Sequence, residues 1–212
     1  MAKIYLLNNQ KFEGIVNLEV FQVKNVKFDI DLSKYNALVF TSKNAVYSIN
    51  ESAKDWVKIP SYLIAPKTAL EAESLGANIA FIGISGHGND FAFELMPHLK
   101  DKKVLYVKAE KTVSNLPAIL KENGIDLDEV VAYKTTCKKD IKKENLEDGS
   151  TIIFTSPSSV ECFLATYDWN ETFKAISIGR TTAMFLPKDI NCEISDITSV
   201  EECVKLALKD FT

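Results

Sequence analysis

The sequence predicts an α/β protein that consists of two similar domains, each a doubly wound parallel sheet covered by helices. The first observation is an alternation between short, strand-forming apolar runs and segments with the apolar spacing of a helix. The second is an internal repeat. Ile152–Val160 (IIFTSPSSV) matches Leu38–Val46 (LVFTSKNAV), and Ser177–Ala183 (SIGRTTA) matches Leu63–Ala69 (LIAPKTA), both 114 residues earlier. Two matches at one offset indicate a duplicated unit of the flavodoxin-like type.

Local signals give the order of the elements. Apolar and β-branched runs predict one or two strands within Asn17–Phe28, and single strands at Lys3–Leu7, Leu38–Phe40, Tyr62–Ala65, Ile79–Ile82, Val104–Val107, Glu129–Thr136, Thr151–Phe154, Ala175–Ile178 and Asn191–Ile194. Helical spacing, with Ser or Pro at several starts and Gly76 and Gly124 as C-caps, predicts helices at Ser42–Ile49, Lys67–Leu75, Phe91–Leu99, Ser114–Glu122, Ser158–Thr166, Thr181–Leu186 and Val200–Lys209.

The two copies differ in length, and this difference predicts how the chain is divided. The first copy runs through five strands, whereas the second ends after three. Strands for the shorter copy are available at the N-terminus, where Lys3–Leu7 (KIYLL) resembles Lys103–Val107 (KVLYV). We therefore expect the chain to begin in one domain, build the whole of the other, and return, so that the N-terminal strand belongs to the C-terminal domain.

The expected boundaries follow from this path. The discontinuous domain would comprise residues 1–23 and 138–212, and the inserted domain residues 31–130. The connecting segments 24–30 and 131–137 are both β-prone and would pair as a two-stranded ribbon linker. A single long doubly wound sheet remains the alternative.

Composition excludes several classes. The chain has 212 residues, enough for two domains of about 100 residues each. Its net charge of −4 gives no indication of a nucleic-acid partner. The N-terminal apolar run is too short for a signal peptide, and no apolar run of about 18 residues could span a membrane. We expect a cytoplasmic monomer without membrane association.

The cysteines and histidines predict neither a metal site nor a cofactor. The four cysteines, Cys137, Cys162, Cys192 and Cys203, form no CxxC pair. The last three lie in apolar contexts, so we expect buried free thiols, as in a reducing compartment. The two histidines, His87 and His98, have no partner at metal-ligand spacing. Dinucleotide, P-loop and nucleophile-elbow motifs are also absent.

Four strand-to-helix turns rich in Ser and Thr are the candidate binding elements. In an open parallel sheet, ligands bind beyond the carboxyl ends of the strands, where helix starts offer free N–H groups. A helix dipole contributes about 0.3–1 kcal/mol, and a hydrogen bond to a charged group about 1.5–3 kcal/mol. Together the turns would hold a large anionic ligand, although each hydroxyl could also be a plain N-cap. The turns are Thr41–Asn44, Pro66–Thr68, Thr155–Ser158 and Gly179–Thr182, with cations nearby at Lys43, Lys67, Lys108 and Arg180.

Tyr133 is the candidate catalytic group because it lies in an expected linker segment. A tyrosine with a pKa near its usual value of about 10 is protonated at neutral pH. Its hydroxyl could therefore donate a proton or a hydrogen bond to a leaving oxygen. The alternative is a tyrosine that only packs on the ribbon.

The assembled motifs resemble the uroporphyrinogen-III synthase family over nearly the whole chain. ALVFTSKNAV is similar to the family's first Ser-containing turn, and STIIFTSPSSV with AISIGRTTAMFL to its second-domain turns. KVLYVKAEKTVSNLPAILKENGIDLDEVVAYKTT resembles its long strand–helix–strand block, which places the family's tyrosine at Tyr133. DITSVEECVKLALKD resembles its closing helix. The order and spacing of these motifs carry the resemblance.

The resemblance implies an enzyme that cyclises linear hydroxymethylbilane to uroporphyrinogen III, with loss of water and inversion of the last pyrrole ring, in haem biosynthesis. It implies two α/β domains joined by a β-ribbon, no cofactor, and a polyanionic tetrapyrrole substrate. Tyr133 would assist departure of the substrate hydroxyl, and Lys43 and Lys108 would add positive charge. The residues expected to bind carboxylates, largely through backbone N–H groups, are Thr41, Ser42, Thr68, Ser156, Ser158, Arg180, Thr181 and Thr182.

Three departures from the family pattern concern individual contacts. Ala65-Pro66 replaces a Val-Gly pair, and the proline removes an N–H donor from that turn. Lys108-Ala109 stands where the family often has Arg-Gly, and Asn8–Gly14 is too short for a full helix. Two rival functions remain: a non-catalytic two-domain binding protein for an anionic ligand, and a regulatory protein that has lost catalysis.

Overall fold

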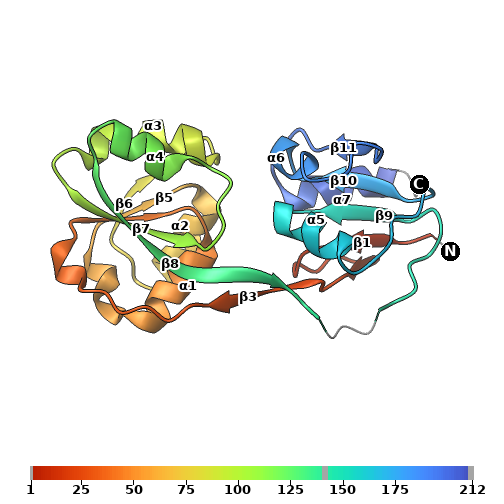
Figure 1. The fold of residues 1–212 in the computed structure, drawn as a ribbon, viewed down its shortest axis with the longest axis horizontal. Helices are drawn as coiled ribbons and strands as arrows, with labels where there is room; N and C mark the ends of the chain where they lie inside the picture. The colour runs from red at the N-terminus through yellow and green to blue at the C-terminus, as the bar shows by residue number, and fades with distance from the viewer. Residues whose placement is uncertain (1, 140–142, 210–212) are drawn as a thin grey trace. The chain divides into compact units, whose positions relative to one another are not determined.

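The chain forms two β-sheets, each covered by helices (Figure 1). The structure is a computed structural model and describes residues 2–139 and 143–209. The five-stranded sheet has the order β11 (Cys192–Ile194), β10 (Lys174–Ser177), β9 (Thr151–Phe154), β1 (Ile4–Leu6), β2 (Ile15–Asn17). The six-stranded sheet has the order β3 (Phe21–Asn25), β8 (Asp126–Cys137), β7 (Lys103–Ala109), β4 (Ala37–Phe40), β5 (Ser61–Leu63), β6 (Ile79–Ile82).

The helices follow strands, as the alternation in the sequence predicts. Helices of the six-stranded sheet are α1 (Lys43–Ser52), α2 (Pro66–Ser74), α3 (Gly88–Leu99) and α4 (Leu116–Glu122), with 3₁₀ helices η1 (Leu32–Lys34) and η2 (Lys54–Lys58). Helices of the five-stranded sheet are α5 (Pro157–Leu164), α6 (Arg180–Ala183) and α7 (Val200–Lys209). The predicted α/β class with parallel sheets is confirmed.

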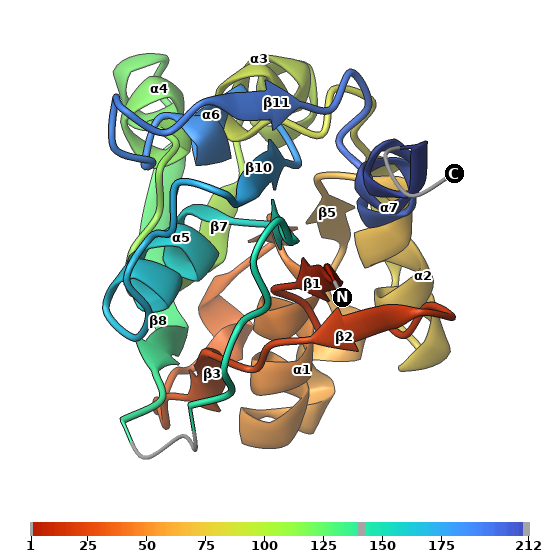
Figure 2. The same ribbon diagram turned by 90° about the vertical axis from the view of Figure 1, so that its right-hand side faces the viewer.

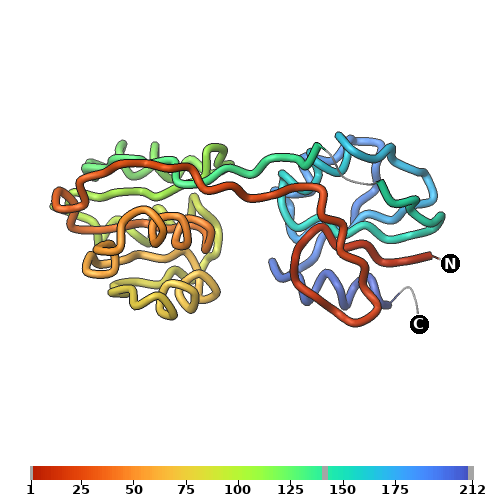
Figure 3. Tube along the Cα trace, turned by 90° about the horizontal axis from the view of Figure 1, so that it is seen from below, coloured from red at the N-terminus to blue at the C-terminus, as the bar shows by residue number. Residues whose placement is uncertain are grey.

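Contacts divide the chain into two compact units. One unit comprises Met1–Gln22 and Thr136–Thr212, and the other comprises Val23–Thr135. We call them the discontinuous unit and the inserted unit. The N-terminal and C-terminal segments lie in the same unit (Figure 3).

Each sheet buries both of its faces. In β7, Val104 and Tyr106 pack with α3 and α4, whereas Leu105 and Val107 pack with α1 and α2. In the discontinuous unit, α5 covers one face of the sheet and α7 the other (Figure 2). Such two-sided burial explains why the strands read as continuous apolar runs.

The internal repeat predicted from the sequence is confirmed by the strand pairing. Leu38 of β4 lies opposite Ser61 of β5, and the residues 114 positions later, Ile152 and Ala175, also lie opposite each other. The order β6-β5-β4-β7-β8 in one sheet corresponds to β11-β10-β9-β1-β2 in the other. The match between Lys3–Leu7 and Lys103–Val107 makes β1 the equivalent of β7.

The segment expected to hold one or two strands forms two, in different sheets. β2 lies at the edge of the five-stranded sheet, and β3 at the edge of the six-stranded one. The N–H of Lys138 donates to the carbonyl of Val20, and the N–H of Val26 to that of Ala132. The partner numbers run in opposite directions, so β3 and β8 are antiparallel. β3 ends at Asn25, so residues 26–30 of the expected first linker segment are not strand.

The expectation of a free thiol at Cys162 is wrong, because this cysteine forms a disulfide with Cys137. The end of β8 lies beside α5, and the two Cα atoms are 5.0 Å apart. The partners are 25 residues apart in the sequence, so no local motif signals the pair. Cys192 and Cys203 are free thiols, and burial raises the pKa of Cys203 to about 11.

Two smaller expectations concern loops. Helix α3 begins at Gly88, inside the expected loop Ser85–Asp90, and the Glu94 carboxylate accepts the N–H groups of Ile84 and Ser85 just before it. No helix forms between β1 and β2 in the described chain, as the short Asn8–Gly14 segment predicts. Phe12 instead packs against the core that α7 covers.

Candidate active site

The expected turns lie at the carboxyl ends of β4 and β5 in the inserted unit, and of β9 and β10 in the discontinuous unit. In each turn the backbone passes from an extended residue into the first turn of a helix, where the leading N–H groups have no intrahelical acceptor. The two sets of turns are described separately, one unit at a time.

The first turn of the inserted unit is built around a capped helix. Ser42 is the N-cap of α1, and its hydroxyl accepts the N–H of Asn44 at 3.2 Å. The N–H of Ala45 donates to the Ser42 carbonyl. Lys43, the first residue of α1, is exposed. Its side chain and its N–H are therefore available to a ligand.

Thr41 immediately precedes this cap and contacts a second tyrosine. Its hydroxyl lies 2.8 Å from the hydroxyl of Tyr106, which belongs to β7 and is fully buried. Tyr106 was not predicted from the sequence, because the contact joins residues 65 positions apart. Burial raises the pKa of Tyr106 to about 12.

A β-bulge sets the direction of the Tyr133 side chain. Lys108 of β7 lies opposite Val131 of β8, but the next residue, Ala109, lies opposite Tyr133. Ala132 is therefore an extra residue on β8, which is the pattern of a bulge.

The bulge changes the face to which Tyr133 belongs. Before it, Leu127 packs on the α3 and α4 side of the sheet and Val130 on the α1 and α2 side. Because of the extra residue, the consecutive residues Ala132 and Tyr133 both pack on the α1 side. The Ser48 hydroxyl in α1 donates to the Ala132 carbonyl and holds the bulge.

Tyr133 is 8% exposed, and burial raises its pKa above the ordinary value. A hydrogen bond with the Ser42 hydroxyl offsets part of that shift. The phenol is therefore protonated at neutral pH and lies beside the cap of α1. This arrangement can supply a proton or a hydrogen bond to an oxygen at the carboxyl end of the sheet.

The second turn of the inserted unit offers fewer donors. Ala65, the N-cap of α2, makes no side-chain cap, and Pro66 has no N–H. Thr68 is 8% exposed, and its N–H donates to the Ala65 carbonyl. Lys108 is also less available than expected, because its ammonium pairs with the Glu129 carboxylate at 2.9 Å.

The first turn of the discontinuous unit is a reciprocal capping box. The Ser156 hydroxyl accepts the N–H of Ser159, and the Ser159 hydroxyl accepts the N–H groups of Thr155 and Ser156, all at 3.1 Å. Pro157 has no N–H. Ser158 is therefore the first-turn residue whose N–H remains for a ligand. Ser159 was missed by the sequence analysis, although its spacing from Ser156 is that of a capping box.

The second turn of the discontinuous unit is richer in donors. Gly179 precedes α6, whose first two residues, Arg180 and Thr181, are exposed. The N–H of the third residue, Thr182, donates to the Gly179 carbonyl, and Thr182 is 3% exposed. The turn thus presents two N–H groups and a guanidinium.

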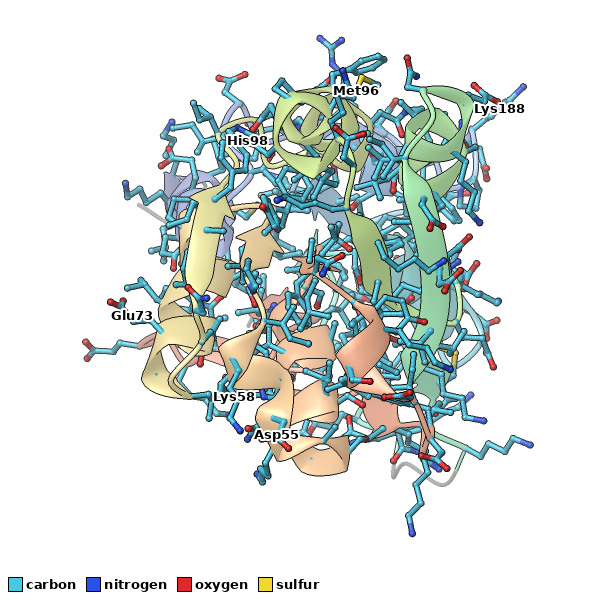
Figure 4. The ribbon with its side chains drawn as sticks, turned by 90° about the vertical axis from the view of Figure 1, so that its left-hand side faces the viewer. Asp55, Lys58, Glu73, Met96, His98 and Lys188 are labelled. Carbon is cyan, nitrogen blue, oxygen red and sulfur yellow. A yellow bond between two sulfur atoms is a disulfide. The ribbon has the colours of Figure 1, made fainter. Side chains whose placement is uncertain are left out.

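The hollows that the structure describes lie at the amino ends of the strands, opposite the turns of the candidate site. One of 480 Å³ is lined by residues that precede β4 and β5, including the ion pair of Asp55 and Lys58, which Figure 4 labels. Another of 560 Å³ is lined by residues that precede β9 and β10. Both are therefore separate from the turns at the carboxyl ends.

The structure describes residues 2–139 and 143–209, and two kinds of feature are absent from this part of the chain. No group of three His, Cys, Asp or Glu side chains lies close enough there to hold a metal ion. No helix in this part of the chain has the length and apolar content needed to cross a bilayer.

Comparisons with known proteins give consistent results. The family model described as "Uroporphyrinogen-III synthase HemD" matches residues 18–195. The crystal structure of uroporphyrinogen-III synthetase from Helicobacter pylori 26695 is 33% identical, covers 99% of each chain and has a TM-score of 0.86. A mutant uroporphyrinogen III synthase from Thermus thermophilus is 14% identical, with 99% and 100% of the two chains covered and a TM-score of 0.59, which shows a shared fold. A comparison with curated protein sequences gave no match.

Proposed function

The chain belongs to the uroporphyrinogen-III synthase family, and from this premise we propose that its Ser- and Thr-rich turns and Tyr133 form the synthase active site. The chain is a cyclising lyase of haem biosynthesis with a tetrapyrrole substrate. The observation that carries this conclusion is a structural match of 33% identity over 99% of both chains. The reaction converts hydroxymethylbilane to uroporphyrinogen III, with inversion of the last ring and loss of water.

The substrate carries several carboxylates, and we assign their binding to the turns of both units. The N–H groups at the starts of α1, α5 and α6 that the caps do not use support this assignment, because they point beyond the strand ends. Lys43 and Arg180 add exposed cations. Lys108 is assigned a weaker contribution because its ammonium already pairs with Glu129, a carboxylate that it shares with Lys121. Residues assigned to carboxylate binding are Thr41, Ser42, Lys43, Thr68, Lys108, Ser156, Ser158, Arg180, Thr181 and Thr182.

Tyr133 acts on the departing hydroxyl group. As the carbon–oxygen bond breaks, the phenol proton is donated to the hydroxyl oxygen, and the electron-rich pyrrole stabilises the carbon left behind. The oxygen leaves as water. The buried phenol and the bulge that directs it support this role. The enzyme must also hold the two ends of the linear tetrapyrrole so that closure with inversion of the last ring is faster than direct closure.

The proposed domain organisation is a discontinuous domain of residues 1–23 and 138–212, and an inserted domain of residues 31–130. Segments 24–30 and 131–137 would form the ribbon linker. The pairing of β3 with β8, and the division between units near residues 22 and 135, support this organisation. The protein would act in the cytoplasm as a monomer, without a metal or other cofactor.

The test is turnover of freshly prepared hydroxymethylbilane, followed by oxidation and isomer analysis of the product. We expect type III uroporphyrinogen well above the amount in an enzyme-free control. Only type I product, in the amount seen without enzyme, would refute the synthase activity. The comparisons give no support to the alternative of a non-catalytic protein that binds an anionic ligand.

A further inference from the structure

The buried hydroxyl of Tyr106 is a polar group that the proposed mechanism does not use. Its ring packs in the core between β7 and helices α3 and α4, and the residue is 0% exposed. Thr41 is the partner that the described structure gives to its hydroxyl, with the oxygens 2.8 Å apart. A buried phenol with no acceptor would be unfavourable, so this contact matters for the fold.

Chemistry decides the direction of the hydrogen bond. A phenol is more acidic than an aliphatic alcohol and is correspondingly the better donor. If Thr41 donated to Tyr106, the Tyr106 proton would be left buried without an acceptor. Tyr106 therefore donates to Thr41, and the Thr41 proton remains available to another acceptor.

Thr41 is placed to use that proton on a ligand. It follows the last residue of β4, directly before the N-cap of α1, and it is partly exposed. A threonine hydroxyl that already accepts one hydrogen bond is the more polarised donor for a second. A substrate carboxylate bound at this turn would accept it.

The equivalent threonine of the other unit is arranged differently. The Thr155 hydroxyl donates to the carbonyl of Leu7 at 2.7 Å, so its proton is already used. The position equivalent to Tyr106 is Leu6, which has no hydroxyl. The repeat therefore provides one threonine that can donate to a ligand and one that cannot.

We propose that Tyr106 is a positioning residue, which holds the Thr41 hydroxyl so that its proton is directed to a carboxylate of the tetrapyrrole. This inference rests on the proposed function, because it takes the Thr41 turn as part of the substrate site. Tyr106 does not touch the substrate and acts only through Thr41.

The experiment measures the dissociation constant for uroporphyrin III, the oxidised product, together with KM and kcat for hydroxymethylbilane. Tyr106→Phe should raise the dissociation constant and KM about fivefold, and Thr41→Val about tenfold, which is the loss of one hydrogen bond to a charged group. The kcat should change less than about twofold in both variants. The double variant should bind no more weakly than Thr41→Val alone, because both changes remove one pathway.

Two further variants separate positioning from a general structural effect. Tyr62→Phe removes another buried phenol of the same unit, whose hydroxyl lies 3.5 Å from the His98 carbonyl, and should leave affinity unchanged. Thr41→Ser keeps the hydroxyl, so it should bind like the wild type and still lose about fivefold when Tyr106→Phe is added.

Wild-type affinity in Tyr106→Phe, or effects that multiply in the double variant, would overturn the inference. Failure of the synthase activity itself is recognised separately, by type I product from the wild type. If the wild type still binds uroporphyrin III in that case, the affinities of the variants decide the role of Tyr106. If the wild type does not bind uroporphyrin III, the inference is overturned as well.

Discussion

Both units attach strand β8 to the same position of an equivalent helix, but with different chemistry. Ser48 in α1 donates a hydrogen bond to the Ala132 carbonyl of β8. The residue 114 positions later, Cys162 in α5, forms a disulfide with Cys137 at the end of β8. A hydrogen bond contributes about 1 kcal/mol to stability, whereas a disulfide that closes a loop of this length contributes about 3 kcal/mol. The two equivalent positions therefore contact the same strand through interactions of different strength.

The turns differ in a reciprocal way. In the inserted unit, α1 begins with Lys43 and α2 with Pro66. At the equivalent positions of the discontinuous unit, α5 begins with Pro157 and α6 with Arg180. Each unit thus has one helix whose first residue supplies both a cation and an N–H, and one helix whose first residue is a proline that supplies neither. Under the proposed function, we expect anion binding to be strongest at one turn of each unit.

The largest expected effect on stability is loss of the disulfide. Cys137→Ala should lower the free energy of unfolding of the discontinuous unit by about 3 kcal/mol, because the unfolded chain gains the entropy of an open loop. Denaturant unfolding monitored by hydrogen exchange would resolve the two units. Cys192→Ala, a free and partly buried thiol, is the control. A loss below about 1 kcal/mol would mean that the disulfide contributes no more than the Ser48 hydrogen bond.

Replacement of the phenol in the inserted unit should have the largest effect on rate. Tyr133→Phe should lower kcat about 100-fold, because general acid assistance is removed while the ring still packs. Affinity for uroporphyrin III should stay within about threefold. Tyr5→Phe, a buried tyrosine of the discontinuous unit, serves as the control for turnover of hydroxymethylbilane. Full rate with only type III product from Tyr133→Phe would show that the phenol has no chemical role.

The Ser48 hydrogen bond should couple the bulge to catalysis. Ser48→Ala removes one of the two donors to the Ala132 carbonyl, the other being the Val26 N–H, and should destabilise the inserted unit by about 1 kcal/mol. It should also lower kcat about tenfold by displacing Tyr133, with little change in affinity. Ser52→Ala, one turn later on α1, removes a hydroxyl that bonds only within the helix and should leave the rate unchanged. Equal kcat values for Ser48→Ala and Ser52→Ala would show that the bulge does not influence the reaction.

The smallest effect concerns the cations of the turns. Arg180→Ala should raise KM about fivefold with kcat unchanged, because an exposed charge near bound carboxylates contributes about 1 kcal/mol. The effect should decrease at high salt. Lys54→Ala, at the opposite end of a sheet, is the matched control. Identical KM values for Arg180→Ala and Lys54→Ala would show that α6 does not belong to the substrate site.

Much of the fold could be read from the sequence, because apolar periodicity reports buried strands and helices directly. The repeat added long-range information, because residues that pair between β4 and β5 have counterparts 114 positions later that pair between β9 and β10. Tyr133 and the turn residues remain predictions, made from local sequence and the family resemblance. The burial of Thr68 and Thr182, and the ion pair of Lys108, could not be read from local spacing.

The sequence by itself determined the α/β class, the duplicated unit and the turns at the strand ends, because each depends on residues close together in the chain. Only the tertiary structure decided which distant groups meet. The bulge at Ala132 turns Tyr133 toward Ser42, Tyr106 of β7 contacts Thr41 at the end of the neighbouring strand β4, and Cys137 forms a disulfide with Cys162. These contacts depend on the register between strands and on the packing of helices against them, and a one-residue change in register would separate the partners.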